Sequence, residues 1–339
     1  MSSIREALAL LAERHDLPPD LMRAAMSEIM GGEADPAQIG GFLMALRVKG
    51  ETPAEIAAGA EVMRGFAAQV QIDREGLTDI VGTGGDGASL FNVSTASAFV
   101  AAAAGVRVAK HGNRAVSSKS GAADVLEAAG CRLDLNPSQV AQLIEALNVG
   151  FLFAPSHHAA MKHAIGPRKS LGLRTLFNLL GPLTNPALAP NQVLGVFSSE
   201  LLKPMAEVMQ TLGARHVMVV RSTDGLDEIS PCAPTQVAEL RNGAIGEYQV
   251  FPEDFGIQVD ALDSLIVQGA ADSLALIESA LAGEPGPAAD MIALNAGAAI
   301  YVSGQAESLA AGVERAREVL AKGAGLTRLR EYAKRTRAL

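Results

Sequence analysis

The sequence of 339 residues contains no tryptophan and only two cysteines, and its aromatic residues make up 4% of the chain. Cys131 and Cys232 lie far apart and form no C-x-x-C pattern, which favours free thiols in a reducing compartment over a disulfide framework. No apolar run approaches the roughly 20 residues that a membrane-spanning helix needs. Charged residues such as Arg5 and Glu6 interrupt the N-terminal stretch, so we expect a helix there and no signal peptide. These absences predict a cytoplasmic protein without membrane contact.

The chain also lacks positive charge overall, because its formal net charge is −9, and this argues against binding nucleic acid through a general basic surface. Acidic residues are themselves absent from two stretches, 87–123 and 146–199. The basic residues of these stretches include Arg107, Lys110, His111, Arg114, Lys119, Lys162, His163, Arg168, Lys169 and Arg174. An acidic chain that keeps carboxylates out of two regions predicts an anion pocket there.

The first seventy residues carry helix signals and no strand signals. Asp35 before Pro36 places an N-cap in front of a proline at the first helical position. Thr52 and Glu55 have the spacing of a capping box. Apolar residues between these signals recur at helical intervals. This part of the sequence therefore predicts an all-helical unit.

From Thr78 onward, short β-rich runs alternate with helical stretches. The runs are Thr78–Val81, Val106–Ala109, Phe151–Phe153, Val193–Phe197 and Val217–Val220. This alternation predicts parallel βαβ units and hence an α/β domain. Two further runs, Gln236–Arg241 and Gly246–Phe251, flank Asn242-Gly243 and predict an antiparallel hairpin. The chain beyond Ala261 is again helical, and the Gly- and Pro-rich segment Arg168–Pro186 predicts an excursion out of the sheet domain.

A glycine-rich loop, Gly82-Thr83-Gly84-Gly85-Asp86, directly follows the first predicted strand. Glycines let the backbone approach a ligand and point its N–H groups at a phosphate. The loop continues to Asn92-Val93-Ser94-Thr95, which opens a predicted helix, Ala96–Ala104, whose N-terminus favours an anion. The loop is neither a Rossmann nor a P-loop motif. A purely structural turn remains the alternative.

A second motif, Lys110-His111-Gly112-Asn113-Arg114, follows the strand predicted at Val106–Ala109, and Ser117, Ser118 and Lys119 come soon after it. Cationic, amide and hydroxyl groups at the carboxyl end of a strand suit a ligand with several anionic oxygens. A solvated basic loop is the alternative.

Two adjacent carboxylates, Asp227 and Glu228, follow the strand predicted at Val217–Val220. An open α/β sheet binds its ligands at this end of its strands. Mg²⁺ takes one or two protein carboxylates together with phosphate oxygens, so the pair is a candidate metal site. A pair of exposed surface acids is the alternative.

The glycine-rich loop and the Lys110–Arg114 motif resemble the signature pair of the anthranilate phosphoribosyltransferase family. Two further segments, Arg174–Pro186 and Asp224–Glu228, match the anthranilate enzymes specifically. The resemblance covers essentially the whole chain, with one departure at Ala159, where the family usually has proline or another small residue. It implies a small helical domain, residues 1–72 joined by part of 168–190, and a larger α/β domain, residues 73–339, with a mostly parallel central sheet.

The same resemblance implies an activity. The phosphoribosyl group of phosphoribosyl pyrophosphate (PRPP) would pass to the amine of anthranilate, with release of pyrophosphate, in L-tryptophan biosynthesis. It also implies Mg²⁺ as cofactor, two ions per subunit, and a homodimer that pairs through the helical domain.

Site residues follow from the matching motif positions. The resemblance assigns PRPP to Gly82, Thr83, Gly84, Gly85, Asp86, Asn92, Ser94, Thr95, Lys110 and Ser118. It assigns anthranilate to Gly82, His111, Asn113, His158 and Arg168, with the carboxylate on Arg168 and the amine near Asn113. It assigns the metal to Ser94, Asp227 and Glu228. No residue is assigned as a catalytic acid or base.

Two other functions fit parts of the sequence. A pyrimidine nucleoside phosphorylase would share the fold and a lysine–serine phosphate site, but such chains are usually longer and do not combine the glycine loop with the Asp227-Glu228 pair. A non-catalytic relative that binds nucleic acid would need a broad basic surface, which a chain of charge −9 does not predict.

Overall fold

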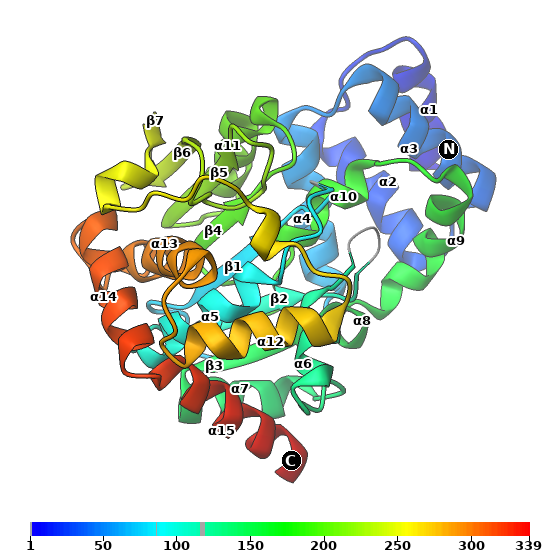
Figure 1. Ribbon diagram of the computed structural model, residues 1–339. Helices are drawn as coiled ribbons and strands as arrows, with labels where there is room; N and C mark the ends of the chain where they lie inside the picture. The colour runs from blue at the N-terminus through cyan, green and yellow to red at the C-terminus, as the bar shows by residue number, and fades with distance from the viewer. Residues whose placement is uncertain (1, 86, 116–118) are drawn as a thin grey trace.

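A seven-stranded sheet with helices on both faces lies at the centre of the computed structural model, which describes residues 2–85, 87–115 and 119–339 (Figure 1). The strands are β1 (Thr78–Gly82), β2 (Val108–Gly112), β3 (Val149–Phe153), β4 (Asn191–Gly195), β5 (His216–Ser222), β6 (Thr235–Arg241) and β7 (Ala244–Val250). The order across the sheet is β3-β2-β1-β4-β5-β6-β7.

The first five strands of the sequence run parallel, and β6 and β7 are antiparallel additions at one edge. The predicted hairpin is confirmed, because β6 and β7 meet at Asn242 and Gly243, whose φ angles of 54° and 76° suit a two-residue turn. The predicted mostly parallel sheet is also confirmed. Its parallel strands all end at the same edge, which is where such sheets bind ligands.

Every observed strand differs from the predicted run by one to three residues at one end or both, most at β2 and β4. The strand expected at Val106–Ala109 begins at Val108 and continues to Gly112, because β2 pairs with β3 in register from Val108 opposite Val149 to Gly112 opposite Phe153. Lys110 and His111 therefore lie inside a strand and not in the loop after it. The strand expected at Val193–Phe197 ends at Gly195.

Neighbouring residues of the sheet pack into two separate cores. Ile80, Val193 and Met218 belong to one core, which also contains α5 (Val93–Ala103) and α13 (Pro287–Val302). Leu194 and Val217 belong to the other, which contains α11 (Leu202–Thr211) and the N-terminal helices. Side chains alternate between the faces of a strand, so both faces of this sheet are covered with apolar groups.

The N-terminal helices are α1 (Ser3–Ala12), α2 (Pro19–Gly31), α3 (Pro36–Lys49) and α4 (Pro53–Phe66). Their predicted caps are confirmed, since the Asp35 carboxylate accepts the Ala37 N–H at 2.8 Å and Thr52 forms a capping box with Glu55. A 3-10 turn at Ala159–Met161 leads into α9 (Lys162–Leu171), and α10 (Leu176–Leu180) follows. Both helices pack against this bundle, as the sequence led us to expect for the Arg168–Pro186 excursion (Figure 1).

The remaining α-helices lie in the middle and C-terminal parts of the sequence. They are α6 (Ala122–Ala128), α7 (Pro137–Leu147), α8 (Ala154–His157), α12 (Ala270–Leu281), α14 (Leu309–Ala321) and α15 (Ala324–Ala338). Within the described ranges, no helix is long and apolar enough to cross a bilayer. Both cysteines are free thiols, Cys131 buried and Cys232 half-buried.

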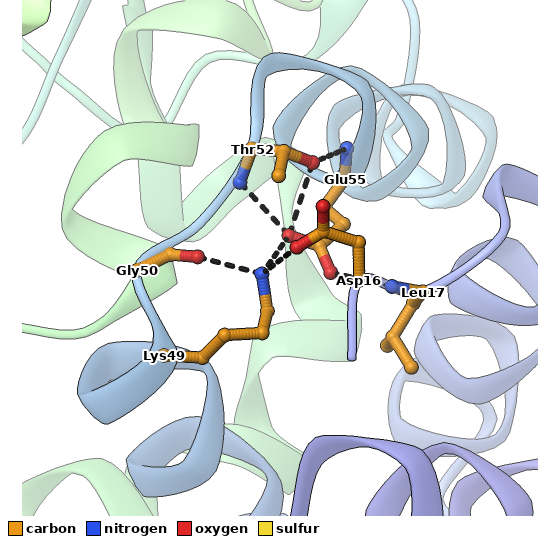
Figure 2. A network of polar contacts seen from close by, with 6 residues as sticks. All are labelled: Asp16, Leu17, Lys49, Gly50, Thr52 and Glu55. Atoms are coloured by element: carbon orange, nitrogen blue, oxygen red, sulfur yellow. Dashed lines mark hydrogen bonds and ion pairs between the residues drawn. The ribbon is translucent and has the colours of Figure 1, made fainter. Parts of the chain in front are cut away.

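A buried ion pair joins three parts of the helical bundle (Figure 2). The Glu55 carboxylate is fully buried, accepts the backbone N–H groups of Leu17 and Thr52 at 2.8 Å each, and lies 2.9 Å from the Lys49 ammonium. Lys49 also contacts Asp16 at 2.8 Å and donates to the Gly50 carbonyl at 2.6 Å. The network fixes the end of α3 and the start of α4 against the chain that precedes α2.

We expect Glu55→Ala to lower the free energy of unfolding by about 3 kcal/mol or more, because it leaves a buried ammonium with fewer partners. Urea unfolding followed by circular dichroism measures this change. Glu61→Ala is the matched control, since the Glu61 carboxylate also pairs with a basic side chain, Arg23 at 2.7 Å, but is 37% exposed. That control should change stability by about 1 kcal/mol or less. Equal effects of the two substitutions would contradict the role given to burial.

Candidate active site

The glycine-rich loop after β1 has a backbone conformation that residues with a side chain rarely adopt. Gly84, Gly85 and Gly87 have φ angles of 66°, 86° and 78°. Thr83 ties the loop to the end of β4, because its N–H donates to the Gly195 carbonyl at 2.9 Å and its hydroxyl accepts the Phe197 N–H at 3.1 Å. These hydrogen bonds therefore position the glycine-rich loop at the edge of the sheet where the parallel strands end.

The segment that carries Asp227 lies directly on the ends of β1 and β4. A Cβ atom at Gly195 would overlap the Asp227 carbonyl oxygen, and one at Gly82 would overlap the carboxylate oxygen Oδ2. The same Oδ2 accepts the Gly84 N–H at 2.8 Å. The absence of side chains at Gly82 and Gly195 thus brings the carboxylate against the glycine loop. Sequence reasoning included Gly82 but missed Gly195.

The N-terminus of α5 and Lys110 lie together on one face of the sheet. Asn92 caps the helix, its side-chain oxygen accepting the Thr95 N–H at 3.1 Å. The buried Lys110 ammonium donates to the Ser94 hydroxyl at 3.0 Å and to the Ile80 carbonyl at 2.7 Å. The Thr95 hydroxyl is buried and has no hydrogen-bond partner among the residues that the structure describes. Helix N–H groups, two hydroxyls and an ammonium make this a site for an anion.

Asp227 and Glu228 are the candidate ligands for magnesium. Burial lowers the pKa of Lys110, and the charges of Asp79 and Glu228 oppose this shift. In the described parts of the chain, no group of three or more histidine, cysteine, aspartate or glutamate side chains gathers in a metal-binding arrangement. A pair of carboxylates fits Mg²⁺, whose other ligands come from substrate phosphate oxygens and water.

Two histidines lie on the opposite face of the sheet. The rings of His111 and His158 are both buried, with centroids 5.2 Å apart. The His111 Nδ1 lies 3.1 Å from the Gly181 carbonyl, so in the neutral ring Nδ1 carries the proton and Nε2 is an acceptor. Nε2 of each ring is buried and has no partner within the described ranges. In each ring, Nε2 could therefore form a further hydrogen bond.

Both histidines are neutral at physiological pH. Burial lowers the pKa of His111 well below its usual value, and the neighbouring His158 and His157 lower it further. Burial also lowers the pKa of His158 to about 4, with a further contribution from His157 and an opposing one from the Thr184 backbone. This side of the site therefore carries no histidine charge.

Arg168 and Asn113, the other two residues assigned to anthranilate, lie on other elements. Arg168 lies on α9, and its guanidinium carbon is 5.1 Å from the centre of the Phe177 ring. Burial lowers its pKa from the usual value of 12.5, which leaves the group charged. Asn113 is exposed in the turn after β2, where its side chain accepts the Arg114 N–H at 2.7 Å.

Sequence reasoning gave Asp79 no role and grouped Arg174 only with the basic residues of the second acid-free stretch. Arg174 donates to the Gly85 carbonyl, and its guanidinium carbon lies 4.4 Å from the centre of the Phe197 ring. Asp79 is fully buried in β1 and accepts the His111 N–H at 3.0 Å. Two features of the sequence could have found them. Arg174 lies in the second acid-free stretch, and Asp79 is a carboxylate within a predicted strand.

Some predicted positions lie elsewhere or outside the described residues. Arg107 precedes β2, at the end of the strand away from the glycine loop, and pairs with Asp73 at 3.3 Å. It does not contribute to the anion pocket, since a strand carries its two ends to opposite edges of the sheet. Asp86 and Ser118, both predicted to bind PRPP, lie outside the described residues.

Comparisons with known proteins identify the family of this chain. Residues 5–67 match the glycosyl transferase family, helical bundle domain, and residues 74–326 match the glycosyl transferase family, a/b domain. An anthranilate phosphoribosyltransferase from Thioalkalivibrio sulfidiphilus is 58% identical over 328 residues, 97% of each chain. The chain belongs to the anthranilate phosphoribosyltransferase family.

Solved structures of this family have the same fold. Anthranilate phosphoribosyltransferase from Thermus thermophilus is 46% identical, with a TM-score of 0.93 over 99% of this chain and 100% of that one. The enzyme from Saccharomyces cerevisiae in complex with PRPP and Mg is 29% identical, with a TM-score of 0.90 over 99% and 98%. The resemblance and the fold predicted from the sequence are confirmed.

Gly195→Ala should reduce turnover by roughly 100-fold, because the new Cβ displaces Asp227 by about an ångström or more from its place beside the glycine loop. The Mg²⁺ concentration for half-maximal turnover should rise as well, and a metal titration of the steady-state rate measures both. Gly246→Ala is the control, since a Cβ on that β7 glycine meets no atom within 4 Å. Wild-type metal dependence in Gly195→Ala would contradict this account of Asp227.

The low pKa of His158 predicts a pH dependence of stability. With a pKa of about 4 against an ordinary 6.5, the folded protein binds this proton more weakly than the unfolded chain does. Its contribution is therefore complete above pH 6.5 and decreases below it, by roughly 2 kcal/mol at pH 5. Urea unfolding between pH 8 and pH 5 should show a smaller loss in His158→Gln than in the wild type. Parallel pH profiles would contradict the burial of a neutral ring.

Proposed function

We propose that this chain transfers the phosphoribosyl group of PRPP to the amine of anthranilate, releasing pyrophosphate, as a step of tryptophan biosynthesis. PRPP lies against the glycine loop, the α5 N-terminus and Lys110, and anthranilate lies on the side of His111, His158, Asn113 and Arg168. The names of the relatives support both substrates, and the complex of the yeast enzyme with PRPP and Mg supports the donor and the metal.

The observation that carries this proposal is the opposite orientation of two consecutive residues in β2. Lys110 extends to Ser94 at the start of α5, whereas His111 extends to Gly181 and the ring of His158. Successive side chains of a strand point to opposite faces of its sheet. One strand end therefore presents a cation to the donor and a neutral ring to the acceptor, close to where the two substrates must meet.

The donor side would bind and orient the leaving group. Lys110 supplies positive charge, and the glycine-loop and helix N–H groups supply oriented donors for phosphate oxygens. As pyrophosphate leaves C1 of the ribose, its negative charge increases and these groups bind it more strongly. Mg²⁺ held by Asp227, Glu228 and Ser94 would supply further stabilisation of that charge.

The acceptor side would position an uncharged nucleophile. The aromatic amine is neutral near pH 7, so attack at C1 needs orientation more than prior deprotonation, and orientation alone contributes up to roughly 7–11 kcal/mol. The amine nitrogen bonds to C1 as the bond from C1 to pyrophosphate breaks, and the amine then loses one proton. Arg168 would bind the carboxylate, and the acceptor atom Nε2 of His111 is available to the amine N–H.

Several expectations from the family resemblance stay predictions. These are two magnesium ions per subunit, a homodimer formed through the helical bundle, the cytoplasmic location, and the division of the chain near residue 72. The individual substrate and metal contacts are part of the same proposal.

The direct test mixes the purified protein with PRPP, Mg²⁺ and anthranilate and follows the loss of anthranilate fluorescence. We expect decay that EDTA abolishes. A folded protein that binds PRPP by calorimetry but leaves the fluorescence unchanged would refute anthranilate as the acceptor.

Arg168→Ala should raise the anthranilate KM roughly tenfold or more, because a hydrogen bond to a charged group contributes about 1.5–3 kcal/mol. The PRPP KM should change little. Steady-state kinetics with each substrate varied in turn separate the two effects. Lys169→Ala removes the neighbouring positive charge from an exposed position and serves as the control. A rise in the PRPP KM alone would contradict the acceptor assignment.

A further inference from the structure

Asp79 is a fully buried carboxylate in the interior of β1. Burial raises its pKa to about 6, although Lys110 and hydrogen bonds from Asn185 and His111 oppose the shift. A buried carboxylate is unfavourable unless donors surround it. Its neighbours in the strand, Thr78 and Ile80, are also buried, so an apolar side chain would suit this environment. The carboxylate therefore needs a specific explanation.

Both oxygens of Asp79 accept hydrogen bonds from groups of the acceptor side. Oδ1 accepts the backbone N–H of His111 at 3.0 Å, and Oδ2 accepts the side-chain amide of Asn185 at 2.8 Å. The same amide nitrogen donates to the Ala109 carbonyl at 2.7 Å, and the Asn185 oxygen accepts the Ala187 N–H at 2.8 Å. One carboxylate thus connects β2 to the segment 181–187.

Segment 181–187 returns from α10 in the helical bundle to β4 in the sheet. The Gly181 carbonyl lies 3.1 Å from the His111 ring, and the Pro182 carbonyl accepts the Gln192 side chain at 2.8 Å. His111 is therefore held twice, its backbone by Asp79 and its ring by a segment that Asp79 also anchors through Asn185. A shift of either anchor would move the ring.

We propose that Asp79 is a positioning residue of the acceptor side, which sets the place of the His111 ring and of segment 181–187 in a single arrangement. It does not contact a substrate and acts through His111 and Asn185. This inference rests on the proposed function, because it assigns His111 to the side of the aromatic amine.

The chemistry explains why a carboxylate is needed at this position. Both neighbours are N–H donors, and an ionised carboxylate offers an acceptor oxygen to each. Asparagine has the same shape but one acceptor oxygen and one NH₂ group. In Asp79→Asn, either the His111 N–H or the Asn185 amide faces another donor and loses its bond. The substitution therefore disturbs positioning with little change of volume.

The test compares steady-state kinetics of the wild type, Asp79→Asn and Gln192→Met in the full-length protein. We expect Asp79→Asn to raise the anthranilate KM about tenfold, equivalent to about 1.4 kcal/mol, with the PRPP KM changed less than about threefold. Gln192 is the matched comparison, because it lies opposite Asp79 on β4 and its side-chain amide donates to the same returning segment, whereas Asp79 also accepts the His111 backbone N–H. Because Gln192 holds only the returning segment and not the His111 backbone, its substitution should raise the anthranilate KM by a smaller factor, less than about threefold.

A reciprocal exchange, Asp79→Asn with Asn185→Asp, gives a second measure. The amide at position 79 then donates to the carboxylate at position 185 while its oxygen still accepts the His111 N–H. The exchange leaves the Ala109 carbonyl without its donor, so we expect it to recover part of the anthranilate KM and not all of it. An exchange that recovers none of the anthranilate KM would contradict the role given to these hydrogen bonds.

Thermal melting and calorimetric PRPP binding establish that each variant is folded. If Asp79→Asn does not fold, Asn185→Ala removes one of the two anchors and should raise the anthranilate KM by a smaller factor. Equal rises in both KM values, or an effect of Gln192→Met as large as that of Asp79→Asn, would overturn the inference. Absence of turnover in the wild type would instead refute the proposed function.

Discussion

The close contact of the Asp227 segment with the ends of β1 and β4 is the constraint on which the site depends. Gly82 and Gly195 leave no side chain between strand and segment, so the Asp227 carboxylate reaches the N–H of Gly84. A larger residue at either strand end would move the carboxylate away from the glycine loop. The Asp227 carboxylate, the glycine loop and the sheet edge are therefore one arrangement, set by two positions without side chains.

Under the proposed function, the sheet separates the donor side of the site from the acceptor side. Lys110, Ser94 and the start of α5 lie on one face, and His111, His158 and segment 181–187 lie on the other. Burial acts on both groups, lowering the pKa of Lys110 on the donor face and those of the two histidines on the acceptor face. Asp79 and Glu228 oppose the shift at Lys110, so under the proposed function a cation faces the departing pyrophosphate and neutral rings face the uncharged amine.

Much of this architecture follows from the sequence because the responsible signals are local. Helix caps at Asp35 and Thr52, the Asn242-Gly243 turn and the alternation of strands with helices all depend on neighbouring residues, and each is confirmed. The extent of β2 was wrong because the strand ends where pairing with β3 ends, which is a property of two segments about forty positions apart.

The missed residues share the same cause. Gly195 looks like an ordinary strand end until the Asp227 segment lies on it. Asp79 resembles a misplaced charge until Asn185, more than a hundred positions later, donates to it. Arg107 was grouped with the anion pocket by its position in an acid-free stretch, although it lies at the other end of its strand and pairs with Asp73. The role of each of these residues depends on its neighbours in space, which a local sequence pattern does not show.

The account is tested most directly by a crystal structure of this protein with PRPP and Mg²⁺ bound. We expect the pyrophosphate to contact the glycine loop and Lys110, with metal density between its oxygens and the carboxylates of Asp227 and Glu228. The face that carries His111 and Arg168 should remain open to the acceptor. PRPP bound on the His111 face, or metal bound away from Asp227 and Glu228, would contradict the division of the site described above.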